Sequence, residues 1–191
     1  MADSKLFQAS WELVKALDKV ADKSLPLDIS NIVKTHSKAA AAASVAAGWI
    51  PGAGGTMAVG AAAASIWSMY VRINKKIDLP FTENIIKSLA SGIATNLAAY
   101  AVATVIGAGI ISFIPGIGSV TAAVIAGTTS YALTIASGFV YIKILTNIFK
   151  AKQDPTSFSL DDLKDIANET IKTENIKEVM KEAKKEYKSN K

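Results

Sequence analysis

The sequence predicts an all-α fold built around two hydrophobic helical hairpins, and three observations support it. Two long runs, residues 39–71 and 88–142, carry no charged side chain. Each run contains the same aromatic-Ile-Pro-Gly-x-Gly turn, at residues 49–54 and, 64 positions later, at 113–118. Outside the runs, apolar residues recur at helical spacing, and no segment shows the alternation of a strand.

The composition argues against most kinds of chemical site. A chain of 191 residues suits one domain. Cysteine is absent, which excludes disulfides and thiolate metal sites, and a single histidine, His36, argues against an imidazole metal centre or a catalytic triad. We predict no catalytic residue, no cofactor and no metal ligand, and an enzyme is the least expected class.

The net charge of +5 is concentrated around the apolar runs. Residues 39–150 hold six Lys or Arg and two acids, which gives +4, whereas residues 151–191 hold nine of each sign. Bases that flank apolar segments are typical of the cytoplasmic side of membrane proteins, not of a nucleic-acid-binding stripe. The N-terminus lacks the apolar core of a signal peptide, so we expect cytoplasmic termini and no nucleic-acid partner.

The first half of the chain predicts three helices. An amphipathic helix over residues 4–23 is expected to stop before Pro26, which disfavours helix in the residue preceding it. A second helix is expected from Asp28 or Ser30 to about residue 49, and a third from 56 to about 76. Residues 78–80, ending in a proline, are the predicted connector.

The second half predicts four more. Thr82 is the expected N-cap of a helix over 83–112, and another helix runs over 119–150. Ser159 and Asp162 have capping-box spacing and open the first of two short charged helices, expected as a solvated hairpin. The predicted organisation is a hydrophobic hairpin domain with its N-terminal amphipathic helix over 1–150, and a charged helical segment over 151–191.

Both hairpin turns are assigned to proline and glycine. The predicted turn residues share the property of breaking a helix, and they are Pro51, Gly52, Gly54, Pro115, Gly116 and Gly118. The glycine-rich stretch 52–55 precedes a helix, but it lacks both the Lys-Ser/Thr of a phosphate-binding loop and a preceding strand. We therefore interpret it as a turn, and the chain as not itself a GTPase.

These motifs resemble those of the DUF697 family. Residues 36–43, the first turn at 50–53 and the second at 114–120 carry the resemblance, which covers about residues 30–148. The resemblance implies a hydrophobic helical module of the kind found in bacterial membrane proteins and behind certain GTPase domains, with no catalytic residue. One departure is Gly54-Gly55, which stand where the family often has a polar or acidic residue.

The lengths of the arms separate the two hairpins. A spanning helix needs about 20 apolar residues, which the arms 88–112 and 119–142 supply. The arms 39–49 and 56–71 are short, so a re-entrant or protein-buried hairpin is expected there. Aromatic and basic residues at the predicted membrane interface are Trp49, Trp67, Tyr70, Arg72, Lys75, Lys76, Lys87 and Lys143. For Trp67, Tyr70 and Arg72, ordinary packing is an equal alternative.

We therefore expect a non-enzymatic membrane-associated protein that self-associates through its small residues and acts as a scaffold, an anchor or a remodelling component. Its expected partners are the lipid bilayer and further copies of itself. A soluble core is disfavoured because a helix that is apolar on all sides needs many neighbours, which an oligomer could supply. The alternatives are a soluble module that partners a GTPase, and a colicin-like pore-forming effector.

Overall fold

The computed structural model describes residues 2–48, 54–107, 119–151 and 158–189, and these ranges contain seven α-helices and no strand. The all-α prediction is thus confirmed. The helices are α1 (Ala2–Ala16), α2 (Leu25–Gly48), α3 (Gly54–Ile77), α4 (Glu83–Gly107), α5 (Ser119–Lys150), α6 (Leu160–Thr173) and α7 (Ile176–Ser189).

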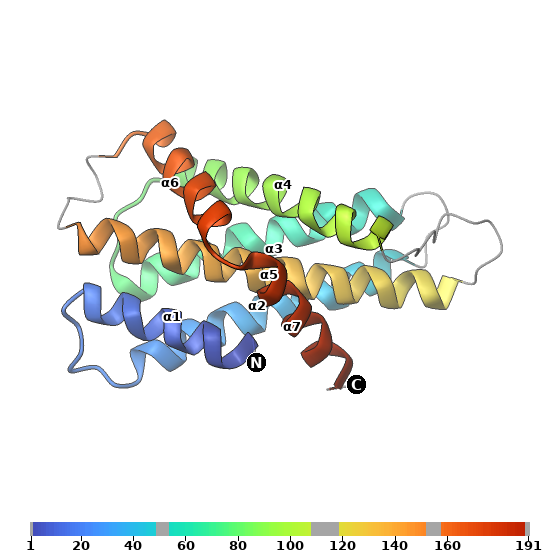
Figure 1. Cartoon of the computed structure of the whole chain (residues 1–191), viewed down its shortest axis with the longest axis horizontal. Helices are drawn as coiled ribbons and strands as arrows, with labels where there is room; N and C mark the ends of the chain where they lie inside the picture. Colours follow the sequence, from blue (N-terminus) through green and yellow to red (C-terminus); the bar gives the residue numbers. More distant parts are fainter. Residues whose placement is uncertain (1, 49–53, 108–118, 152–157, 190–191) are drawn as a thin grey trace.

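Helix α5 lies at the centre of the molecule (Figure 1). Each of the other six helices contacts it, and every residue from Ser130 to Ile142 is buried. Helices α2, α3, α4 and α5 run lengthwise beside one another, and the shorter α1 lies along α2 and α5. One chain therefore supplies the neighbours that an all-round apolar helix needs, without an oligomer.

Helices α1 and α3 end in the same way. Lys19 N–H donates to the carbonyl of Val14 and Leu79 N–H to that of Asn74, while Asp18 and Asp78 hold positive φ angles of 55° and 59°. This left-handed closure is more often made by glycine. It stops α1 at Ala16 instead of the predicted residue 23. Lys19 Nζ then contacts Asp78 Oδ2 at 3.3 Å and joins the two ends.

Helix α2 begins at Leu25, three residues before Asp28, the earlier of the two predicted starts. The prediction was wrong because Pro26 lies in the first turn, where its missing N–H removes no helical hydrogen bond. The carbonyl of Ser24 accepts from the N–H of Asp28 at 2.9 Å and so begins the helix.

The predicted starts of α4, α5 and α6 agree with the structure, whereas α1 and α3 each begin two residues before the predicted positions 4 and 56. Helix α5 has the predicted bounds, and Thr82 Oγ1 accepts from Ile85 N–H at 3.5 Å at the start of α4. Ser159 and Asp162 form the predicted capping box of α6. The predicted C-terminal hairpin is wrong: α6 and α7 run one after the other diagonally across the bundle, α6 on α4 and α5, and α7 on α5 and α1 (Figure 1).

Candidate functional site: a covered apolar helix and its ion pairs

Helix α5 has the length and composition of a membrane span. Of the helices in the described ranges, it alone passes such a test: within Ala123–Lys150, a window of 18 residues has a mean hydropathy of 1.5. That window is 83% buried among the other helices. A helix that is apolar on all sides belongs either in a protein core or in lipid, so α5 fits both environments.

Three threonine hydroxyls along α5 bond to the helix itself. Thr128, Thr134 and Thr146 each donate to the carbonyl four residues earlier, at 2.7, 2.9 and 2.8 Å. A threonine satisfied in this way needs no partner outside its helix. These three side chains therefore add little polarity to α5 in either environment.

Other polar groups of α5 bond across to neighbouring helices. Ser130 accepts from Ser44 on α2 at 2.7 Å, and Tyr141 donates to Asn74 Oδ1 on α3 at 2.6 Å. Tyr131 donates to Glu186 on α7 at 2.9 Å. These bonds fix how α5 sits among the helices around it and would be broken if α5 left them.

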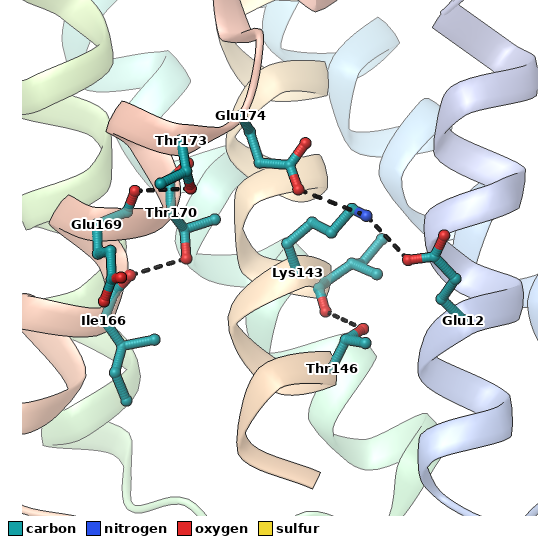
Figure 2. Close-up of polar contacts among 9 residues, drawn as sticks. Glu12, Lys143, Thr146, Ile166, Glu169, Thr170, Thr173 and Glu174 are labelled. Carbon is teal, nitrogen blue, oxygen red and sulfur yellow. Dashed lines mark hydrogen bonds and ion pairs between the residues drawn. The ribbon is translucent and has the colours of Figure 1, made fainter. Parts of the chain in front are cut away.

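Lys143 is the first charged residue after the uncharged run of α5. Its Nζ lies 2.9 Å from Glu12 Oε2 on α1 and 3.5 Å from Glu174 Oε1 between α6 and α7 (Figure 2). The Lys143 side chain is only 19% exposed. We call these three residues the Lys143 cluster; it links the end of the apolar run to the helices on two of its sides.

The charge of the Lys143 cluster changes the titration of its glutamate on α1. The hydrogen bond from Lys143 is the main cause that lowers the pKa of Glu12, and burial opposes it. Glu12 therefore stays ionised in the folded protein below the pH at which an ordinary glutamate takes up a proton.

Helix α1 is held on both flanks by further ion pairs. Lys5 Nζ lies 3.0 Å from Glu178 and 3.5 Å from Glu182, both on α7. On the other flank, Lys34 of α2 contacts Asp3 at 2.9 Å. All of these pairs are partly exposed, so each contributes about 1 kcal/mol or less.

Two glycines of α5 allow neighbouring helices to come close. A β-carbon on Gly127 would lie 2.5 Å from Val45 Cγ2 and 3.1 Å from the hydroxyl of Tyr187, and one on Gly138 would lie 2.6 Å from Val33 Cγ1. Contacts under 3.0 Å are not tolerated without a shift, so both positions require glycine as long as Val45 and Val33 keep their side chains.

A small groove lies beside Lys143. It has a volume of about 260 Å³ and is lined by Lys5, Gln8, Ala9, Phe139, Lys143, Glu174, Asn175 and Val179. Both lysines in it already face glutamates. Within the described residues, no three His, Asp or Glu side chains come together as a metal ion would need.

The predicted turn residues fall mostly outside the described ranges. Pro51, Gly52, Pro115, Gly116, Gly118 and the predicted interface residue Trp49 all lie there. Gly54 is the first residue of α3. Gly54, which was predicted to lie in the turn, is therefore helical.

The other predicted interface residues do not share one environment. Tyr70 is fully buried: its hydroxyl lies 2.7 Å from Ser137 Oγ and its ring stacks on Tyr141, which is ordinary core packing. Trp67 is partly buried, and Lys87 Nζ lies 5.0 Å from the centre of its ring. Arg72 and Lys75 are exposed, while Lys76 pairs with Asp28 at 2.7 Å.

Sequence reasoning placed Lys143 at an interface but missed its partners. Glu12 lies 131 positions away, and no local pattern joins the two residues. One signal was present: apart from the terminal Lys150, Lys143 is the single charge of α5, and it has no acid one turn away on its own helix. A partner on another element would follow from that isolation.

Comparison with known proteins gives no relative. No family model matches this chain. No curated protein and no solved structure matches it either. The resemblance to the DUF697 family therefore stays a prediction.

Proposed function

We propose that this chain is a membrane-associated protein in which α5, paired with α4, enters the lipid bilayer once the helices that cover it move aside. The observation that carries the proposal is that α5 combines three properties of a membrane-spanning helix. It is long enough to span, carries no charge from Ser119 to Ile142, and has three of its threonines bonded within the helix.

The covering helices suit such a change because they are amphipathic. Helix α7 contacts the bundle through Ile176, Val179, Met180 and Ala183 and presents lysines and glutamates on its other faces. A helix of this kind has a second stable location at a membrane surface. Lys143 lies at the end of the uncharged run, where its ammonium would remain at the headgroups while α5 spans.

Within this proposal, the protein acts as an anchor, a scaffold or a membrane-remodelling component and associates with further copies through its small residues. If the inserted helices also open a path for solutes across the bilayer, the protein acts as a pore-forming protein. This activity would appear as leakage of a dye from vesicles.

The second candidate is a soluble helical interaction module with a GTPase as its partner. The observation that favours it is the 83% burial of the apolar window of α5, which is what the core helix of a soluble protein displays. In that case α5 never leaves the bundle, and the protein acts through its surface.

A reversible lock on α5 separates the two candidates. A β-carbon on Gly138 would lie 2.6 and 2.8 Å from the two γ-carbons of Val33, so Val33→Cys/Gly138→Cys places two thiols in contact between α2 and α5. The chain has no other cysteine. The remaining neighbour, Met69 Sδ at 3.3 Å, belongs to a flexible side chain.

The protein is purified without detergent, mixed with liposomes and recovered by flotation after an alkaline carbonate wash. We expect the reduced variant and the native chain to resist the wash and to protect α5 from protease. The oxidised variant should be washed off. If the reduced variant and the native chain are also washed off completely, membrane insertion is refuted and the soluble module stands.

A further inference from the structure

The large apolar side chains that remain exposed in the described residues are concentrated near the N-terminus. They are four in number: Phe7, Val20, Leu27 and Val124, with exposures of 44%, 43%, 51% and 39%. The first three lie on α1, on the connection that follows it, and on the first turn of α2. Val124 lies apart from them on α5.

The ion pair between Asp3 and Lys34 marks where α1 and α2 face each other. Phe7 follows Asp3 by one turn of α1, and Leu27 precedes Lys34 by seven residues, which is two turns of α2 on the same face. The two helices run in opposite directions, so both displacements point the same way along the boundary (Figure 1). Phe7 and Leu27 therefore lie along one seam, and Val20 lies at its end in the connection.

An aromatic side chain and a lysine border this seam. Trp11, partly buried, follows Phe7 by one turn, and Lys15 Nζ lies 5.6 Å from the centre of its ring. Amphipathic aromatic rings combined with lysines are typical of surfaces that settle at the headgroup level of a bilayer. Lys23 is exposed between Val20 and Leu27 in the connection.

The charge around the seam is positive once the ion pairs are set aside. Glu12 faces Lys143, Asp28 faces Lys76, Asp3 faces Lys34 and Asp78 faces Lys19. Five exposed bases remain on α1, α2, the connection and the neighbouring end of α3, against two exposed acids, Asp18 and Asp22, and the partly buried Glu186 of α7 beside Asp3; the bases are Lys15, Lys23, Lys38, Arg72 and Lys75. This balance is complementary to anionic headgroups.

We propose that the seam between α1 and α2, made of Phe7, Trp11, Val20 and Leu27 with Lys15 and Lys23, is the surface on which the folded protein first adsorbs to an anionic lipid bilayer. This inference rests on the proposed membrane function and adds the step that precedes insertion. Adsorption uses the closed bundle: the apolar side chains enter the headgroup region, the bases contact lipid phosphates, and α5 stays covered.

The test uses the oxidised Val33→Cys/Gly138→Cys protein, in which α5 cannot leave α2 but the seam is unchanged. Its co-sedimentation is measured with vesicles of phosphatidylcholine alone and of phosphatidylcholine mixed with phosphatidylglycerol. We expect binding to the mixed vesicles only, and reversal by high salt. Phe7→Ser/Leu27→Ser should weaken this binding about tenfold or more, because two apolar side chains no longer enter the bilayer.

Val124→Ser is the matched control, because among the described residues Val124 is the large exposed apolar side chain that lies outside the seam. Its binding should equal that of the locked parent. The seam is refuted if Phe7→Ser/Leu27→Ser binds as the parent does, if Val124→Ser loses as much, or if neutral vesicles bind equally well. Capture of a protein partner by the seam, with no adsorption to either kind of vesicle, would also overturn it.

The two proposals fail in different ways. If the oxidised protein adsorbs to neither vesicle while the reduced protein still resists the carbonate wash, the seam is wrong and membrane insertion stands. If the oxidised protein adsorbs in a salt-sensitive way but the reduced protein never resists the wash, the seam is right and insertion of α5 is wrong.

Discussion

The rings of Tyr70 on α3 and Tyr141 on α5 stack with their centroids 3.9 Å apart and an angle of 10° between their planes. The hydroxyl of each tyrosine forms a hydrogen bond with a residue on the other tyrosine's helix. Tyr70 bonds to Ser137 on α5, and Tyr141 bonds to Asn74 on α3. Each helix thus gives one tyrosine and one smaller polar residue, a turn apart, to a buried arrangement that fixes α5 against α3.

Removal of one hydroxyl from this arrangement should cost more than removal of a complete pair. Tyr141→Phe leaves Asn74 buried without its hydrogen bond, and the Asn74 Nδ2 already has no partner. We expect a loss of about 1–3 kcal/mol in the free energy of unfolding. The measurement is urea denaturation followed by circular dichroism.

Adding Asn74→Leu to Tyr141→Phe tests the reason for that loss. With both polar partners gone, no buried group is left unsatisfied, so most of the stability should return. If the double variant is less stable than Tyr141→Phe alone, the bond between Asn74 and Tyr141 is not what the tyrosine contributes.

Gly138→Ala should destabilise the protein by about 1–3 kcal/mol, because its methyl group would meet both γ-carbons of Val33 at 2.6 and 2.8 Å. Val33→Ala in the same chain should recover part of that loss. Gly92→Ala on α4 is the control: its added carbon meets nothing within 4 Å, so helix propensity should raise stability by about 0.5–1 kcal/mol. Equal thermal midpoints for the two glycine variants would contradict the close contact of α2 with α5.

Local signals explain which parts of this fold the sequence predicts. The capping box joins Ser159 to Asp162, three positions apart, and the bounds of α5 follow from the Pro-Gly motif before it and the polar stretch 151–157 with Pro155 after it. The end of α1 was missed because Asp18 takes a left-handed conformation that glycine usually signals. Helical spacing also cannot tell what covers a helix, so Tyr70 was as easily assigned to a membrane interface as to the core.

Which helices pack around α5 could not be predicted from the sequence, because the contacts join residues far apart in the chain. Contacts such as Lys143 with Glu12 join residues 131 positions apart, and many other pairings satisfy the same helical patterns. Helix α7 has charges on its outer faces that favour a solvated helix, but only the structure places its apolar side against α5 and α1 instead of α6. Amphipathicity predicts that a face is buried, and it does not name the surface that buries it.

Glu12→Gln should lower stability near neutral pH and have little effect in acid. The pKa of Glu12 in the folded protein is lowered by its hydrogen bond from Lys143. Its contribution is therefore present above the unfolded pKa, near 4.5, and is lost as the pH falls through the lower folded value. We expect a loss of about 1 kcal/mol at neutral pH, measured by urea unfolding across the acid range.

Glu83→Gln is the comparison for Glu12→Gln. Glu83 pairs with Lys87 on the exposed face of α4, one turn apart on the same helix, at 2.9 Å. Such a pair contributes only a few tenths of a kcal/mol. If both variants lose the same stability at neutral pH, the Lys143 cluster holds α1 no better than an ordinary surface pair.

Glu186→Gln should show the opposite dependence on pH. Burial beside α5, reinforced by the charge of Asp3, raises the pKa of Glu186, although the hydrogen bond from Tyr131 opposes the shift. The pKa of Glu186 is thus higher in the folded protein than the value of 4.5 in the unfolded chain. This difference stabilises the folded state at a pH below 4.5, and the stabilisation is lost as the pH rises through the pKa of the folded protein. Glutamine keeps an oxygen for Tyr131 but carries no charge. It should therefore stabilise the protein by a few tenths of a kcal/mol near neutral pH and by nothing in acid. Urea unfolding at both pH values measures the difference, and a loss of stability at neutral pH would show that the ionised carboxylate is the form that holds α7 on α5.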